Sequence, residues 1–186
     1  MKMAKKLLFL FLFLPAIVFS QDKPKFGITF HGYVKSDLLF DTRQTVDARE
    51  GQFLLYPKNE KLDVEGADIN AKASYDMLSI QTRLQGFITG PDVGKAKSSA
   101  YIEGEFFGMS NFDINGFRLR HAFLKLKWEK ASILVGQYWH PMFATNCYPG
   151  TVSFNTGVPF QPFSRNPQIR LTKNVGSFNF EFVALS

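Results

Sequence analysis

A single alternating run of thirteen residues constrains this chain more than any other feature of its sequence. From Ile28 to Phe40 the even positions are mostly apolar and the odd positions mostly polar, which is the period of a β-strand whose two faces meet different surroundings. Strands of soluble proteins usually have about five or six residues, whereas a tilted strand that crosses a membrane needs about nine to eleven. The run therefore predicts a membrane-spanning strand.

Alternation of this kind recurs along the chain and predicts about seven long strands, with no helix of note. After 28–40, strands are expected over 77–89, 98–108, 118–128, 131–140, from 168 to about 172, and from 177 to the end. Residues 67–75 are expected to extend the second strand beyond the membrane, after a slip of phase near Asp76 that a turn or a β-bulge would cause.

The connections between the expected strands are alternately short and long. Short turns are predicted near 90–97, 129–130 and 174–177, and long loops over 41–66, 109–116 and 141–166. Short turns on one side and long loops on the other are typical of outer-membrane proteins. The predicted fold class is therefore all-β, a transmembrane antiparallel β-barrel.

Seven strands do not close such a barrel. Bacterial single-chain barrels have an even number of strands, at least about eight. Each backbone group left unpaired in lipid costs several kcal/mol. We therefore expect this sequence to be the N-terminal part of a longer barrel protein. The alternative is that several copies of the chain close one barrel together.

The first twenty residues have the layout of a secretory signal peptide. Three lysines among the first six residues precede an apolar run over 7–19, and Ser20 lies just before the expected cut. The run is too short to cross a bilayer of about 30 Å as a helix, and a short membrane anchor is the alternative interpretation. We expect residues 1–20 to be removed and 21–186 to be exported to the outer membrane.

Charge and cysteine content exclude two classes of protein. Without the three lysines of the signal peptide, the 22 Lys and Arg of the chain fall to 19, against 16 Asp and Glu. This balance, with no basic stripe or binding motif, does not indicate a nucleic-acid-binding protein. A single cysteine, Cys147, excludes a disulfide framework. Cys147 is expected to be a small filler, because no cationic neighbour in its immediate sequence would make it a reactive thiol.

Several segments resemble the core of trimeric porins. In that family an Arg-x-Ala strand, a tight periplasmic turn and a Gly-Gln or Gly-Arg strand end lead into loop 3, as Phe117–Trp128, Glu129-Lys130 and Ile133–Trp139 do here. Tyr101–Gly108 is similar to the third strand of the family. The resemblance covers most of residues 26–186 and is closest to the DcaP-like porins, which are dicarboxylate channels, in their Bacteroidetes branch.

The resemblance implies a barrel of about 16 strands in the full-length protein. It also implies a homotrimer, and the face of the first strands that is rich in Phe, Ile and Gly suits a seam between subunits. Loop 3 of the family folds into the barrel and forms the constriction, and 141–166 would be that loop here. The loop of general porins carries acidic residues and 141–166 has none, which puts the opposed acidic and basic field of those porins in doubt.

Arginines are the candidates for an anion-binding lining of the pore, because rings of Arg or Lys line anion-selective pores and a guanidinium matches a carboxylate. The candidates are Arg83, Arg118, Arg120, Arg165 and Arg170. The alternative is that each is a solvated residue of the pore or the ion-pair partner of Glu103, Glu105 or Asp37. The strand that holds Arg118 and Arg120 has no clean phase, so these two could instead face a neighbouring subunit.

Other polar and aromatic residues indicate no chemistry of their own. The three histidines, His31, His121 and His140, lie on separate predicted strands without metal-binding or catalytic spacing, and no metal or cofactor site is predicted. Aromatic residues at predicted strand ends suit a girdle at the membrane interface, or else ordinary core packing. They are Tyr33, Tyr75, Trp128, Tyr138 and Trp139.

These observations together predict a passive diffusion channel for small hydrophilic solutes, with a preference for anions such as carboxylates, and not an enzyme. One alternative is an outer-membrane barrel enzyme of the lipase or protease type, which would need Ser, His and an acid at one rim. The other is a soluble β-sandwich that binds a ligand.

Overall fold

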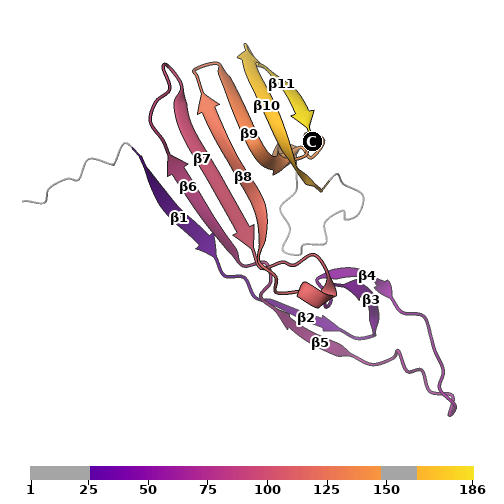
Figure 1. Cartoon of the computed structure of the whole chain (residues 1–186). Coiled ribbons are helices and arrows are strands. Elements are labelled where there is room, and N and C mark those ends of the chain that lie inside the picture. Colours follow the sequence, from indigo (N-terminus) through magenta and orange to yellow (C-terminus); the bar gives the residue numbers. More distant parts are fainter. Residues whose placement is uncertain (1–25, 148–162) are drawn as a thin grey trace, which may run out of the picture.

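The computed structural model describes residues 26–147 and 163–186, and these form an all-β, antiparallel structure (Figure 1). Its main sheet has seven strands in the order β1-β6-β7-β8-β9-β10-β11, each antiparallel to its neighbours, which confirms the predicted fold class and strand number. The strands are β1 (Gly27–Tyr33), β6 (Arg83–Thr89), β7 (Lys97–Glu105), β8 (Arg118–Lys127), β9 (Ala131–Trp139), β10 (Arg165–Val175) and β11 (Phe178–Leu185).

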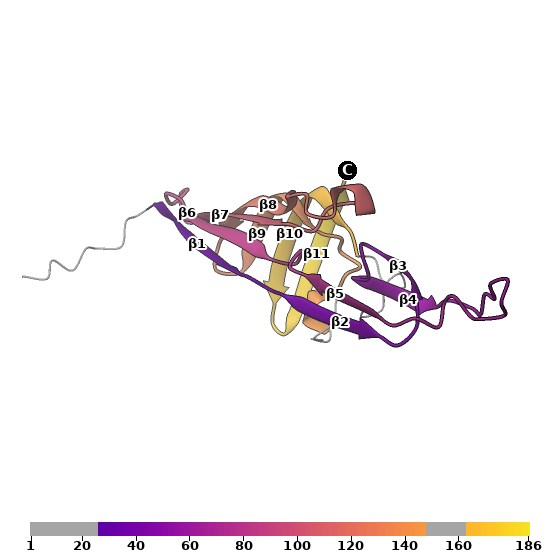
Figure 2. The same cartoon turned by 90° about the horizontal axis from the view of Figure 1, so that it is seen from below.

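An arm of two further strand pairs extends from one end of the main sheet. Strand β2 (Asp37–Asp41) pairs with β5 (Ser74–Leu78), and β3 (Thr45–Ala48) pairs with β4 (Phe53–Pro57). Figure 2 shows that the arm continues roughly along β1, whereas β10 and β11 run across that direction, so the sheet is strongly twisted. The prediction that 41–66 is irregular was wrong for the β3–β4 hairpin.

The first predicted strand is also interrupted at 34–36, between β1 and β2. There, hydrogen bonds that involve side chains link the chain to residues 79–82 in place of backbone pairing. The backbone N–H of Lys35 donates to Thr82 Oγ1 (3.3 Å), its Nζ donates to Gln81 Oε1 (2.7 Å), and the hydroxyls of Ser36 and Ser79 lie 2.8 Å apart. The slip of phase predicted near Asp76 therefore lies at 79–82, between β5 and β6.

The connections alternate between short and long, as predicted. At one end of the main sheet the strands are joined by 90–96, 128–130 and 176–177. At the other end lie the arm, residues 106–117 with the 3-10 helix η2 (Asn111–Asp113), and the two described ends of the connection between β9 and β10, which are 140–147 with the 3-10 helix η3 (Thr145–Cys147) and 163–164. We call these the short-turn end and the long-loop end.

The two faces of the main sheet differ in chemistry. The inner face, as we name it, carries Arg83 and Glu103, and the register places His31, Gln85, Glu103 and His121 side by side on it. The outer face exposes large apolar side chains: Ile28, Phe30, Leu84, Ile102, Leu124, Val135, Ile169, Leu171, Phe180 and Phe182. A soluble β-sandwich would cover such a face with a second sheet, whereas in the described residues it is exposed.

A small apolar core lies where the arm meets the sheet. Leu78, Ile80 and Phe107 are buried there, with Phe53 and Ile114 packed against them. The core fixes the arm and the loop after β7 to each other at the long-loop end. In residues 26–147 and 163–186 no helix is long and apolar enough to cross a membrane.

Candidate functional site

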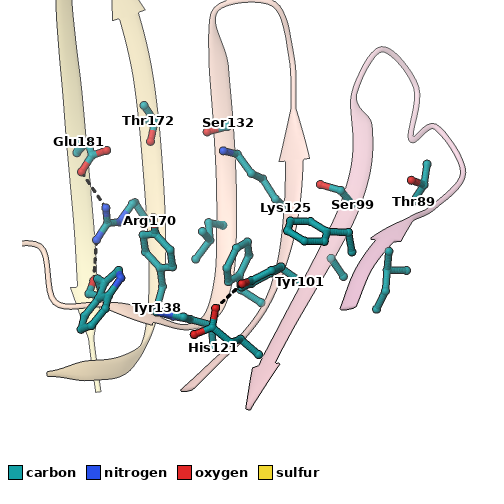
Figure 3. A pocket seen from close by; sticks show the side chains of 17 residues that line it. Thr89, Ser99, Tyr101, His121, Lys125, Ser132, Tyr138, Arg170, Thr172 and Glu181 are labelled. Carbon is teal, nitrogen blue, oxygen red and sulfur yellow. Dashed lines mark hydrogen bonds and ion pairs between the residues drawn. The ribbon is translucent and has the colours of Figure 1, made fainter. Parts of the chain in front are cut away.

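A hollow of about 650 Å³ lies on the inner face, lined by side chains from β6 to β11 (Figure 3). Its wall combines aromatic rings, hydroxyl groups and charged groups. His121 lies on the side toward the long-loop end, while Ser99, Ser132 and Thr172 line the other side (Figure 3). The sheet thus presents a polar, partly aromatic surface on one side and an apolar surface on the other.

Two glutamates and three arginines form a cluster at the long-loop end, beside the hollow. Arg118 donates to Glu105 Oε1 from Nη2 (2.6 Å) and from Nε (3.0 Å), and Arg120 binds both Glu103 and Glu105. Arg83 Nε lies 3.4 Å from Glu105 Oε2. Arg118 and Arg120 therefore belong to the inner face with these glutamates.

A β-bulge explains why the strand of Arg118 and Arg120 shows no clean phase. The register between β7 and β8 shifts between Glu103 and Gly104, so Glu103 lies opposite His121 and Glu105 lies opposite Arg118. A bulge adds a residue to one strand and redirects side chains. The shift brings both arginines of β8 to the two glutamates of β7.

The charged groups at the centre of this cluster are buried, so each of them needs a partner of opposite charge. The side chains of Glu105 and Arg120 are 1% and 3% exposed, so their charges are almost completely withdrawn from water. An unpaired charge in such a place would cost several kcal/mol. Glu103 also accepts hydrogen bonds from the Tyr101 hydroxyl (2.5 Å) and from Gln85 Nε2 (2.8 Å), which completes its coordination.

Arg165 lies beside this cluster but pairs with an aromatic ring. Its guanidinium carbon is 4.9 Å from the centre of the Trp139 ring, and within the described residues it takes part in no ion pair. Its Nη1 is buried without a hydrogen-bond partner. Trp139 in turn contacts Phe143 (4.4 Å between ring centres) and Phe163 (5.1 Å), which fixes both ends of the loop after β9 to the inner face.

Arg170 lies inside the hollow, apart from the cluster. It donates to Gln168 Oε1 (3.1 Å), to the Trp139 carbonyl oxygen (2.9 Å) and to Glu181 Oε2 (3.2 Å), and it lies 5.0 Å from the centre of the Tyr138 ring. Of the five candidate arginines, four therefore have a carboxylate partner. Asp37 is not among those partners, since it pairs with Lys35 at 2.8 Å.

Sequence reasoning missed two features of the hollow. One is Lys125, whose side chain lines it. The other is a set of aromatic rings, Phe87, Tyr101, Phe123 and Tyr138, on the face that was expected to be polar. The phase of the strands contained the signal, because Phe87 follows Arg83 and Gln85 at intervals of two, and Tyr101 stands two residues before Glu103.

The three histidines have different surroundings. His31 contacts Phe87, His121 is buried beside Tyr138 and Trp139, and His140 Nδ1 accepts a hydrogen bond from the Met142 backbone. Across the described part of the chain, no three His, Cys, Asp or Glu side chains are grouped as a metal site. Cys147 is exposed.

The predicted aromatic girdle was wrong for three residues. Tyr138 and Trp139 line the hollow, and Tyr33 lies opposite Arg83 on the inner face. Their position follows from their contacts: Tyr138 packs on Arg170 and Trp139 on Arg165. Arginine over an aromatic face is attracted by the ring, and the attraction is strongest where water is excluded.

Comparison with known proteins supports the fold. No family model and no curated protein matches the sequence. Among solved structures, the outer membrane channel DcaP of Acinetobacter baumannii has a similar structure, with a TM-score of 0.60 and 22% sequence identity. The match covers 88% of this chain and 42% of that channel, so this chain spans less than half the length of the protein that it resembles.

Proposed function

We propose that this chain belongs to an outer-membrane porin of the DcaP-like group, a passive diffusion channel for small hydrophilic solutes. One observation carries the proposal: a single antiparallel sheet has an exposed apolar outer face, a charged and polar inner face, and its long loops at one end. This is the arrangement that a barrel needs when lipid lies outside and water inside. The similar fold of an outer membrane channel supports it.

Electrical recording tests the channel. The intact native protein, purified in detergent and inserted into planar bilayers, should give discrete steps of conductance. A bilayer that stays silent with correctly folded protein would count against the channel, and in that case a search for hydrolysis of lipid or peptide substrates would test the enzyme alternative.

The preferred solutes in this proposal are small anions, carboxylates above all. Three arginines oppose two glutamates in the cluster, and Arg165 and Lys125 add positive charge without an ion pair in the described residues. In a narrow passage with walls of low dielectric constant, an excess of one sign raises the local concentration of the opposite ion. In this proposal Arg83, Arg118 and Arg120 act mainly by neutralising the glutamates. Arg170 lines the hollow, and Arg165 adds its positive field from its place on Trp139.

The loop 141–166 is proposed as the constriction. Its central part, 148–162, lies outside the described residues. Support comes from the two described ends, since Phe143 and Phe163 contact each other (5.2 Å between ring centres) and both contact Trp139, which lines the hollow. Both described ends of the loop are therefore held on the inner face, which is the side that lines the pore in this proposal. Deleting 148–162 should raise the single-channel conductance.

Export and assembly complete the proposal. Residues 1–20, outside the described part, act as the signal peptide, and the mature protein forms a homotrimer of barrels of about 16 strands. Within the DcaP-like group the proposal assigns the protein to the Bacteroidetes branch. N-terminal sequencing of protein from isolated outer membranes should begin at Gln21. Native mass in mild detergent should equal that of three subunits, and a purely monomeric mass would refute the trimer.

A further inference from the structure

A row of aromatic rings crosses the inner face from strand to strand. His31 contacts Phe87 (5.2 Å between ring centres), Phe87 contacts Tyr101 (4.8 Å), Tyr101 contacts Phe123 (5.5 Å), and Phe123 contacts Tyr138 (5.2 Å). The five rings come from β1, β6, β7, β8 and β9. The register agrees, since Phe87 lies directly opposite Tyr101 and Tyr101 directly opposite Phe123.

This aromatic row is unexpected on the face that meets water in a barrel. Inward positions of porin strands are usually polar, and Phe87 is nevertheless 47% exposed. The contacts between neighbouring rings are tilted or edge-on, with interplanar angles from 41° to 88°, and Phe87, Tyr101, Phe123 and Tyr138 all line the hollow. Packing between the rings therefore leaves apolar ring surface available to a solute.

A polar row runs beside the aromatic row, two residues nearer to the short-turn end. Thr89 lies opposite Ser99, and Ser99 lies opposite Lys125, so two hydroxyls and an ammonium stand at one level across β6, β7 and β8 (Figure 3). Two residues advance a strand by about 6.6 Å. A solute with one six-membered ring is thus large enough to touch both rows at once.

We propose that these two rows form a binding site for a pyranose sugar that carries a carboxylate, that is, a uronate. Its apolar C–H face packs on Phe87, Tyr101 and Phe123. Its hydroxyls exchange hydrogen bonds with Thr89 and Ser99. Its carboxylate pairs with Lys125, which has no ion-pair partner within the described residues, whereas Arg170 is already paired with Glu181. The proposal rests on the proposed channel for anions and names the class of anion.

The composition of the two rows favours this solute over simpler ones. An aliphatic dicarboxylate would use the cation but leave the ring surface unused. A neutral sugar would use the rings and hydroxyls but leave Lys125 without a partner. A flat aromatic acid would use the rings and the cation but leave Thr89 and Ser99 unsatisfied, and lost hydrogen bonds of this kind lower affinity.

Calorimetry on the intact protein in detergent tests the site, with glucuronate, glucose, succinate and benzoate as the probes. Glucuronate should bind about tenfold more tightly than each of the others. Glucose lacks the charge-assisted hydrogen bond to Lys125, succinate lacks the contact with the rings, and benzoate lacks the hydrogen bonds to Thr89 and Ser99. Phe123→Leu should lower the affinity for glucuronate by about 2- to 10-fold, which is the contribution of one ring contact. The affinity for succinate should stay unchanged. Phe123→Tyr, which keeps the ring, should bind like the wild type.

Lys125→Gln should reduce the affinity for glucuronate to that for glucose, and leave glucose binding unchanged. Matched controls are Phe182→Leu, the same change on the outer face, and Lys173→Gln, on the outward-pointing phase of β10. Neither control should alter binding. Native migration of each variant on a gel without heating confirms that it is folded.

Three results would overturn the site: glucuronate binding no tighter than glucose or succinate, benzoate binding tighter than glucuronate, or Phe123→Leu without effect on a folded protein. Each is read in solution, without current through a bilayer. Failure of the channel itself appears separately, as absent conductance or cation preference, so a channel that prefers anions but does not bind glucuronate refutes the site alone.

Discussion

Arg120 and Glu105 form an ion pair in which both side chains are almost entirely withdrawn from water, one on β8 and the other on β7. The pair exists because a β-bulge shifts the register between these strands, and Arg118 binds the other oxygen of the same carboxylate. A buried pair of this kind contributes little net stability, but the loss of one partner leaves the others as uncompensated charges. The cluster therefore ties three strands of the long-loop end together.

Glu105→Gln should destabilise the protein strongly, because it leaves Arg118 and Arg120 without their shared carboxylate. We expect a loss of about 3–5 kcal/mol in the free energy of unfolding. Urea unfolding in lipid vesicles, followed by tryptophan fluorescence, measures it. Glu181→Gln is the matched control, since Glu181 is 38% exposed and its pair with Arg170 is worth little. Equal losses in the two variants would contradict the role of burial.

The strands could be predicted from the sequence because alternation of apolar and polar residues is a local property of each strand. Features that depend on how two strands pair could not be predicted from the sequence. The bulge at Glu103 and Gly104 is a relation between β7 and β8, so the faces of Arg118 and Arg120 stayed open. The break at 34–36 depends on hydrogen bonds to residues more than forty positions away. The aromatic row could not be predicted either, because each of its five rings lies on a different strand and only the pairing of the strands brings them together.

Gly136→Ala should weaken the pairing of β8 with β9. The backbone of Gly136 has φ +135°, and a Cβ there would lie 2.2 Å from the Ala122 carbonyl oxygen and 2.7 Å from Phe123 Cα, both backbone atoms that cannot move aside. The loss of unfolding free energy should exceed that of Gly94→Ala, which has a positive φ but open space around it and should cost about 1–2 kcal/mol. The same unfolding assay decides the comparison.

Acid should loosen the loop after β7. Asp113 accepts hydrogen bonds from the Ser110 hydroxyl (2.8 Å) and from the backbone N–H groups of Ser110 (2.7 Å) and Met109 (3.2 Å), and these hold the pKa of its carboxyl below the ordinary value. A depressed pKa means that the carboxylate stabilises the loop above the ordinary pKa of about 3.9, and that this is lost as the pH falls through the lower folded value.

Proton exchange of the backbone N–H groups of Met109 and Ser110 measures this effect. Protection at pH 5 should disappear progressively on acidification below about pH 4. Asp113→Asn should show the weaker protection at every pH, because a neutral amide cannot replace the charged acceptor. Protection that stays constant down to pH 2 in the wild type would contradict the prediction.

Arg165 should contribute to charge selectivity more directly than the paired arginines. Its guanidinium rests on Trp139 at the base of the long loop, and in the described residues no carboxylate pairs with it, so its field is not cancelled locally. Arg165→Gln should therefore lower the ratio of anion to cation permeability, read from the reversal potential across a gradient of potassium chloride. Screening shortens the range of such a field to about 10 Å at 0.1 M salt, so the effect should shrink as the salt concentration rises.

Lys173→Gln, the same loss of charge away from the hollow, should leave the reversal potential unchanged. An unaltered reversal potential in folded Arg165→Gln would show that this arginine does not set the selectivity.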